Sequence, residues 1–324
     1  MKQFNKYNLG WLILTIIGGL ILFFGVSTGS ISVFQQITLV SILINIILAV
    51  GLNLIIGFSG QFSLGHAGFM AIGAYSGAIV GDMVDGILGF ILGLVVGIVI
   101  AIIAALLVGI PTLRLKGDYL AIATLGVSEI IRIIIINIPE LTNGARGISG
   151  IGFPFESSTS FIMVAFLIVV LTTIVTVNYI KSSPGRATIS IREDEIAAES
   201  MGVNTTRYKV IAFMLGAATA SIAGSLYGTF FSVINPSDFT FQRSIDVLII
   251  VVFGGIGSIT GTFVAAIVLG ILTTALQSFG EMRMILYSLA LVAIMVFRPG
   301  GLLGTREFTI SGILNRFTKK EAGK

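Results

Sequence analysis

The sequence contains no cysteine, a single histidine (His66) and few charges, since Asp, Glu, Lys and Arg make up 10% of its 324 residues. The lack of cysteine excludes disulfides, thiol catalysis and Cys-ligated metal sites. One histidine also excludes a His-rich metal centre, so we expect no metal and no cofactor. So few charges cannot cover the surface of a soluble protein, because soluble domains carry about 25% charged residues.

Long apolar runs take the place of the missing charges. The chain is 55% hydrophobic with a mean hydropathy of +1.05, and an apolar run of about 20 residues crosses a hydrocarbon core as a helix. The 40 glycines fit this class, because small residues let membrane helices approach closely. We predict an all-α, polytopic transmembrane helical bundle with about eight to ten membrane segments. The predicted spans are 9–26, 34–57, 63–80, 87–109, 119–137, 161–180, 209–231 and 283–297, with a broken apolar region over 246–277.

Basic residues orient these spans. Most Lys and Arg lie in the amino-terminal tail, the loops 110–118 and 181–209, and the carboxy-terminal tail, and the positive-inside rule places these segments in the cytoplasm. The first apolar stretch lacks a small-x-small cleavage site, so it is interpreted as a span rather than a signal peptide. We predict a multi-pass plasma-membrane protein with both termini in the cytoplasm, a transmembrane domain over 1–300 and a basic tail over 301–324. The net charge of +4 does not indicate nucleic-acid binding.

The region 246–277 is predicted to be a hairpin or re-entrant pair. Seven spans before it leave the chain outside, and the last span must return it to the cytoplasm, so 246–277 must start and finish outside. The turn is expected at the glycine cluster of residues 254–257, although a single tilted span is an alternative. The segments 58–64 and 253–259 share the pattern Phe-x-Gly-x-x-Ser-aliphatic. Paired Gly-broken segments are typical of the substrate path in transporters built from repeats.

The segment 57–69 carries polar side chains and glycines between two spans. Irregular backbone at membrane depth is buried in protein or lines a water-filled cavity. We therefore predict that it lines a translocation path, although the same side chains suit hydrogen bonds between helices. A proton relay through His66 is disfavoured, because no carboxylate lies near it in sequence. The candidate path residues are Gly60, Gln61, Ser63, His66, Gly254, Gly255, Gly257 and Ser258.

The loop 181–208 is predicted to contain a short amphipathic helix on the cytoplasmic side. Ser190 and Glu193 fit a capping box, and acidic residues follow in the first turn, where the helix dipole favours them. Gly202 suits the residue that ends the helix, and Asn204 or Thr205 suits the cap of the next span. Such a helix either docks into a groove of a cytoplasmic partner or only connects two spans.

Two opposite charges are predicted to lie within a span. Glu129 and Arg132 are three residues apart in the span 119–137, so they can pair on one helix face. Charges inside a membrane are candidates for function, and a neutralised pair also serves as a structural lock. No Walker A, Gly-x-Ser-x-Gly or His-Glu-x-x-His motif is present. The chain is therefore not expected to be an enzyme, and any ATPase that drives transport must be another chain.

Several segments together resemble a known family. "GLNLIIGFSGQFSLGHAGFMAIGAY" (51–75), "GDYLAIATLGVSEIIRIII" (117–135), "NGARGISGI" (143–151), "IREDEIAAESMGVNTTRYKVIAF" (191–213) and "DVLIIVVFGGIGSITGTFVAAIVLGIL" (246–272) are similar to the LivM-type permease of branched-chain amino acid ATP-binding-cassette (ABC) importers. The matches follow one another in order from about residue 40 to 305.

The resemblance implies the pore-forming subunit of an importer for leucine, isoleucine or valine that works by alternating access. Its implied partners are a homologous H-type permease, two cytoplasmic ATPase subunits, an extracytoplasmic binding protein and membrane lipid. It also implies that the loop helix is a coupling helix docking into the ATPase, made of Arg192, Glu193, Asp194, Glu195, Ala198, Glu199, Met201 and Gly202. Alternatives are a urea or short-chain amide importer, a stand-alone secondary transporter and an intramembrane enzyme.

Overall fold

The computed structural model describes residues 18–20, 22–26, 28, 31–115 and 117–276, with 280, 282, 285, 288, 289, 292, 296, 300–302 and 304. Most of the predicted first span (9–26) and last span (283–297) lies outside the described residues, as does the tail from 305 onward. The predictions for these parts, and the domain boundaries near residue 300, stay predictions.

Five described helices are long and apolar enough to cross a membrane. They are α2 with its π-helical extension (Val33–Phe58), α4 (Gly86–Thr112), α5 (Asp118–Ile136), α7 (Ser158–Lys181) and α10 (Thr205–Phe231). Each coincides with a predicted span to within a few residues. The predicted span 63–80 is the helix α3 (His66–Met83). It is less apolar because neighbouring helices enclose it, and eleven of its 18 residues are buried.

Glycines hold the centre of the bundle together. A Cβ on Gly73 of α3 would overlap the carbonyl oxygen of Ser221 in α10, and one on Gly224 of α10 would overlap that of Met70. On the other side of α3, Gly93 of α4 packs directly on Gly77. Small residues therefore bring α3, α4 and α10 into backbone contact, as the glycine content predicts.

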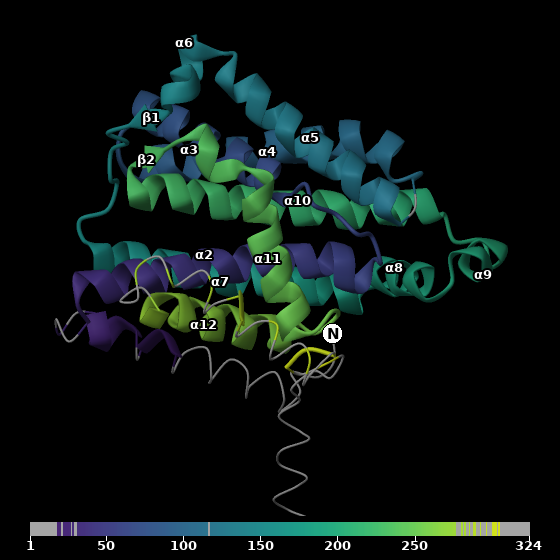
Figure 1. Cartoon of the computed structure of the whole chain (residues 1–324). Helices are drawn as coiled ribbons and strands as arrows, with labels where there is room; N and C mark the ends of the chain where they lie inside the picture. The colour runs from purple at the N-terminus through teal and green to yellow at the C-terminus, as the bar shows by residue number, and fades with distance from the viewer. Residues whose placement is uncertain are drawn as a thin grey trace, which may run out of the picture.

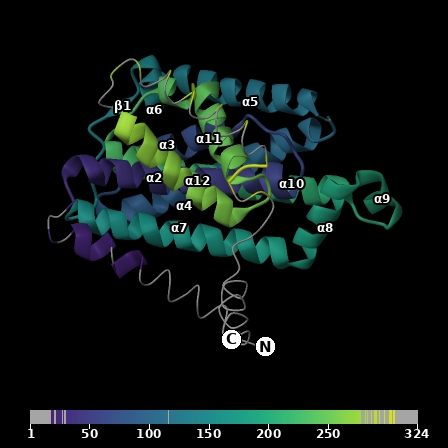
Figure 2. The same cartoon turned by 60° about the horizontal axis from the view of Figure 1, so that its bottom comes forward.

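The two ends of the bundle differ (Figure 1). At one end a two-stranded antiparallel ribbon pairs β1 (Ile148–Ser149) with β2 (Val233–Ile234), matching Ile148 with Ile234. Nearby are α6 (Pro139–Thr142) and the 3-10 helices η2 (Gly144–Arg146) and η3 (Pro236–Phe239). The helices α8 (Ser183–Glu193) and α9 (Glu195–Ser200) project from the opposite end, as Figure 2 also shows. We call these the ribbon end and the arm end, and residues 183–201 the arm.

The broken pair consists of α11 (Phe241–Gly254) and α12 (Ile259–Ala275), bent by 119° at the glycine cluster. Three contacts along α2 give its direction. Arg243 donates to Asn45 in the middle of α2, Gly257 lies at Asn53 near its arm end, and Thr274 bonds Thr38 near its start. The chain thus descends toward the arm end, turns at Gly254–Ser258 and returns toward the ribbon end. The break falls at the predicted glycine cluster, and a bend of this size fits either a broken span or a re-entrant loop, so the re-entrant pair stays a prediction.

Candidate functional site

The two glycine-broken segments of the sequence meet at the arm end of the bundle. The helix α2 passes into a π-helix, η1 (Leu54–Phe58), before the helical backbone stops. Gly57 lies at its last turn, where a Cβ would overlap the backbone of Gly257 and the side chain of Asn53. The resemblance between 58–64 and 253–259 therefore has a spatial counterpart, because Gly57, directly before the first segment, packs on the backbone of Gly257 within the second.

Asn53 fastens the two breaks to each other. Its Oδ1 accepts from the backbone N–H of Gly257 at 2.8 Å, and its Nδ2 donates to the carbonyl of Ser258 at 2.9 Å and to Oγ1 of Thr262 at 2.7 Å. The side chain is fully buried. A buried amide with three hydrogen bonds specifies one arrangement of its partners, because leaving any of these groups unpaired is costly.

We call the place where Gly57 and Asn53 contact Gly257 the junction. Arg192 joins the arm to this junction. The carbonyls of Leu54, Ile55 and Ile56 accept from backbone N–H groups that follow the π-helix. The next carbonyl, that of Gly57, accepts from Nη1 of Arg192 at 2.6 Å. A guanidinium suits this place, because the carbonyl end of a helix carries partial negative charge. The stem of Arg192 packs on Gly60, whose φ of +68° suits glycine.

The arm is built differently from the prediction. Ser190 does not cap a helix, because α8 runs through it from an N-cap at Ser182 to Glu193. The cap of α9 is Asp194, which accepts from the backbone N–H groups of Ile196 and Ala197 at 2.9 and 3.0 Å. The predicted helix thus begins later, and Arg192 and Glu193 belong to α8. Pro184 near the start of α8 favours that helix.

The end of α9 agrees with the prediction. Gly202 has a φ of +81°, and the N–H groups of Gly202 and Val203 donate back to the carbonyls of Glu199 and Ala198. This pair of bonds is a Schellman motif. Asn204 then caps α10 by accepting from the N–H of Arg207 at 3.0 Å.

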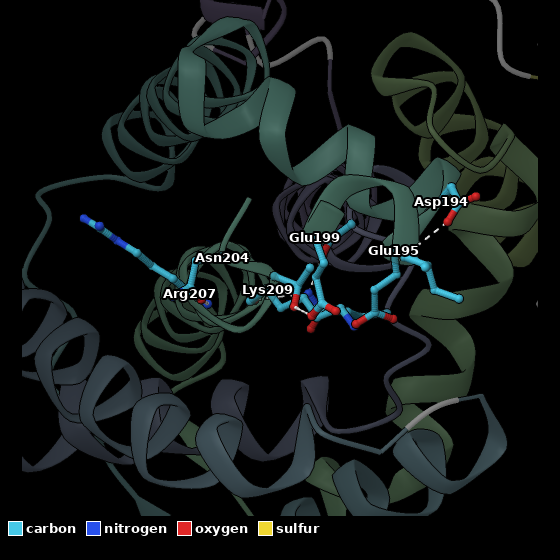
Figure 3. A network of polar contacts seen from close by, with 10 residues as sticks. Asp194, Glu195, Glu199, Asn204, Arg207 and Lys209 are labelled. Carbon is cyan, nitrogen blue, oxygen red and sulfur yellow. Dashed lines mark hydrogen bonds and ion pairs between the residues drawn. The ribbon is translucent and has the colours of Figure 1, made fainter. Parts of the chain in front are cut away.

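Figure 3 shows how the arm is fixed to α10. Lys209 pairs with Glu195 at 2.6 Å, and the hydroxyl of Thr205 donates to Glu199 at 2.8 Å. The side chain of Arg207 points away from this network. The carboxylates of Glu195 and Glu199 therefore stabilise the arm itself.

The outer side of α9 exposes large apolar side chains. Ile196 is 75% exposed and Met201 is 84% exposed, whereas Ala198 faces inward with 5% exposure. Exposed apolar patches mark interaction sites, and these two side chains are candidates for the centre of one. Of the predicted coupling residues, Ala198 is inaccessible to a partner, whereas the exposed ones are Arg192, Glu193, Asp194, Glu199, Met201 and Gly202.

Residues 33–297 match the family described as the branched-chain amino acid transport system permease component. The match covers the long helices, both broken segments and the arm. The chain belongs to this permease family.

Curated relatives agree with this assignment. The chain is 38% identical over 309 residues to the high-affinity branched-chain amino acid transport system permease protein LivM of Salmonella typhimurium, covering 86% of this chain and 71% of the relative. It is 37% identical over 290 residues to LivM of Escherichia coli, covering 81% and 68%. LivH of Salmonella typhimurium is 33% identical over 177 residues, covering 53% and 56%. No solved structure matches the chain.

The predicted path residues of this permease fall into two groups. Gly60, Gln61, Gly254, Gly255, Gly257 and Ser258 lie at or beside the junction of the breaks, where Gln61 donates to the carbonyl of Lys209 at 3.1 Å. Ser63 and His66 lie deeper, in a stretch held by α5 and α11. There Thr124 accepts from the N–H of Leu64, and Ser244 accepts from that of Ala67, both at 3.0 Å.

Several buried polar atoms of the permease have no hydrogen-bond partner among the described residues. Both ring nitrogens of His66, Oε1 of Gln61 and Oγ of Ser128 are in this position. The imidazole faces the backbone of Leu48, in a contact outside hydrogen-bond geometry. Ser128 belongs to α5 and packs against Gly68, half a turn after His66. Buried groups of this kind call for an explanation, such as a ligand or water at some stage of function.

A cavity of about 230 Å³ opens at the ribbon end, away from these residues. Its walls include the aromatic rings of Phe90 and Phe153, with Asp85 at the rim of α4. The pair Glu129 and Arg132 forms as predicted, with Nε and Oε2 2.8 Å apart and both side chains partly exposed. Among the described residues, Glu129 and Arg132 form no hydrogen bond or ion pair with the junction of the breaks.

Sequence analysis missed Asn45 and Asn53 of the permease, although a signal was present. Both are amides inside the apolar run 40–57, where each unpaired polar group would be costly. In the structure both bind the broken pair, Asn45 through Arg243 and Asn53 through Gly257, Ser258 and Thr262. Polar side chains in an apolar span therefore predict helix–helix contacts.

Proposed function

We propose that this permease is the pore-forming subunit of an ATP-driven importer for leucine, isoleucine and valine. The observation that carries the proposal is the arm, which exposes Ile196 and Met201 on its outside and binds the Gly57 carbonyl at the end of α2 through Arg192 on its inside. A stand-alone transporter has no use for an apolar docking surface joined to its helix breaks. The substrate class follows the names of the LivM relatives.

The arm end faces the cytoplasm in this proposal, and both termini lie there. The basic residues of the loop 181–209 support this orientation through the positive-inside rule. Two ATPase subunits, supplied by separate chains, serve this chain and a homologous H-type permease in the plasma membrane. An extracytoplasmic binding protein delivers the amino acid at the ribbon end, where the cavity lined by Phe90 and Phe153 opens.

Alternating access supplies the mechanism. Gln61, Ser63 and His66 are each no more than 2% exposed, so these three side chains are closed off in this conformation. Movement of the broken helices α11 and α12 away from these side chains would open a path beside Gln61 and His66. Their unpartnered polar atoms then meet the ammonium or carboxylate groups of the passing amino acid.

The test is uptake by vesicles that contain this chain with the permease, ATPase and binding protein encoded beside it. We expect ATP-dependent uptake of labelled leucine and no uptake without ATP. Uptake of labelled urea in place of leucine would support an ATP-driven importer and contradict the proposed substrate class. Leucine uptake by this chain alone under an ion gradient would contradict the importer and support a stand-alone secondary transporter.

A further inference from the structure

We propose that Arg192 is a positioning residue that transmits movement of the arm to the two broken helices. This inference rests on the proposed function, because it assigns how the arm and the breaks are coupled. Among the residues that the structure describes, the coupling is a charge-assisted hydrogen bond between the arm and the junction, from Nη1 of Arg192 to the carbonyl of Gly57.

On the α2 side of this hydrogen bond, the residues of the junction are held together so that they move as a rigid unit. Asn53 holds Gly257, Ser258 and Thr262 to α2 by three hydrogen bonds, and Gly57 touches Gly257 directly. A displacement of the Gly57 carbonyl therefore moves the turn between α11 and α12 as well. Farther along the chain, the N–H of Leu302 donates to the carbonyl of Phe253 at 2.8 Å, which connects the residues after the predicted last span to the same turn.

On the other side of this hydrogen bond, the arm is also held rigidly. Asp194 caps α9, and Lys209 pairs with Glu195 at 2.6 Å. Arg192 is the last residue but one of α8, directly before this cap. Its side chain lies inward between Gly60 and Gly257, where a Cβ on Gly257 would come within 3.0 Å of Nη1. A displacement of α9 is therefore transmitted to the guanidinium of Arg192 through the turn that joins α8 to α9.

Arginine is suited to this position in a way that other residues are not. Its guanidinium stays charged and presents several donors in a fixed plane, so it can hold the Gly57 carbonyl while the backbone around it shifts. The carbonyl belongs to a π-helix, a local irregularity that is frequent at functional sites. Loss of the charged donor removes the link and leaves both bodies intact.

The experiment compares Arg192→Gln with Arg192→Lys in the assembled importer reconstituted with its ATPases. We expect Arg192→Gln to keep ATP hydrolysis and to lower leucine uptake per ATP roughly tenfold, the effect of losing one charge-assisted bond. Arg192→Lys should recover part of the ratio. Arg186→Gln is the matched control, because within the described part of the chain its guanidinium on α8 donates to the carbonyl of Lys181 alone, and we expect a parental ratio.

Spin labels give a readout that a merely structural role would not move. The chain has no cysteine, so Ser200→Cys with Ile256→Cys places one label on the arm and one on the turn. Ile256→Cys with Val233→Cys relates the turn to the ribbon end. In the parental complex we expect ATP binding to change the distance from turn to ribbon end and to leave the distance from arm to turn unchanged. In Arg192→Gln we expect ATP binding to change the distance from arm to turn and to leave the distance from turn to ribbon end unchanged.

An unchanged uptake ratio in Arg192→Gln, or an arm-to-turn distance that changes in the parental complex, would overturn the inference. Loss of the ATPase subunits from Arg192→Gln would also overturn it, by making Arg192 a docking residue. If Arg192→Gln does not fold, the inference is still tested by the spin-label distances in the parental chain and by leucine uptake per ATP in Arg192→Lys. Absence of leucine uptake in the parental complex would instead contradict the proposed function.

Discussion

At the scale of single residues, glycines decide how closely helices approach in this permease. Gly73 and Gly224 bring α3 and α10 into backbone contact, and a side chain at either place would overlap a carbonyl oxygen of the other helix. Gly126 in α5, by contrast, has no atom within 4 Å of the position of a Cβ. The same residue type therefore has a packing role at one position and none at another.

We expect Gly73→Ala to destabilise the protein by about 1–3 kcal/mol, because the methyl group forces two backbones apart. Gly126→Ala is the matched control and should leave stability unchanged or raise it by about 0.5–1 kcal/mol, since alanine favours helix. Thermal unfolding in detergent measures both. Equal melting temperatures for the two variants would show that the α3–α10 contact does not depend on glycine.

At the scale of elements, the arm separates two tasks between the faces of α9. Glu195 and Glu199 bind α10, whereas Ile196 and Met201 are exposed. The inward face sets the position of the arm, and the outward face is available to a partner. Because Ala198 is buried, Ala198→Arg is expected to disturb the arm itself rather than a contact with another chain.

We expect Ile196→Asp combined with Met201→Asp to abolish copurification of the ATPase subunits, because charges replace the centre of an apolar contact. Leu141→Asp is the control: Leu141 is 56% exposed on α6 at the ribbon end, and copurification should persist. Full retention of the ATPase by the double variant would place the docking surface elsewhere on the chain.

At the scale of the whole molecule, the proposed orientation puts the two ends of the bundle in different compartments. Ser200→Cys on the arm and Leu141→Cys on α6 each supply one thiol in a chain that has no cysteine of its own. In intact cells or spheroplasts we expect a membrane-impermeant maleimide to label Leu141→Cys at once and Ser200→Cys only after permeabilisation. The reverse order of labelling would invert the orientation and remove the arm from the cytoplasm.

Sequence reasoning located the membrane helices well and the arm less well. Apolar length alone marks spans such as 34–57 and 87–109, because lipid demands a continuous hydrophobic helix. Ser190 was misinterpreted as a cap, since Ser190 and Asp194 both carry side chains that can cap a helix. Ser182 and Pro184 start α8 upstream, and only the continuous helix through Ser190 settles which cap is used.

By itself the sequence determined the class of protein, the predicted spans and the presence of two glycine-broken segments, because these depend on local composition and on the demands of lipid. The tertiary structure alone decided that the two breaks touch, that Asn53 binds Ser258 across 205 residues and that Arg192 reaches Gly57 across 135. Such contacts join groups that no local pattern relates, and they exist only because helix packing brings their backbones within hydrogen-bond distance.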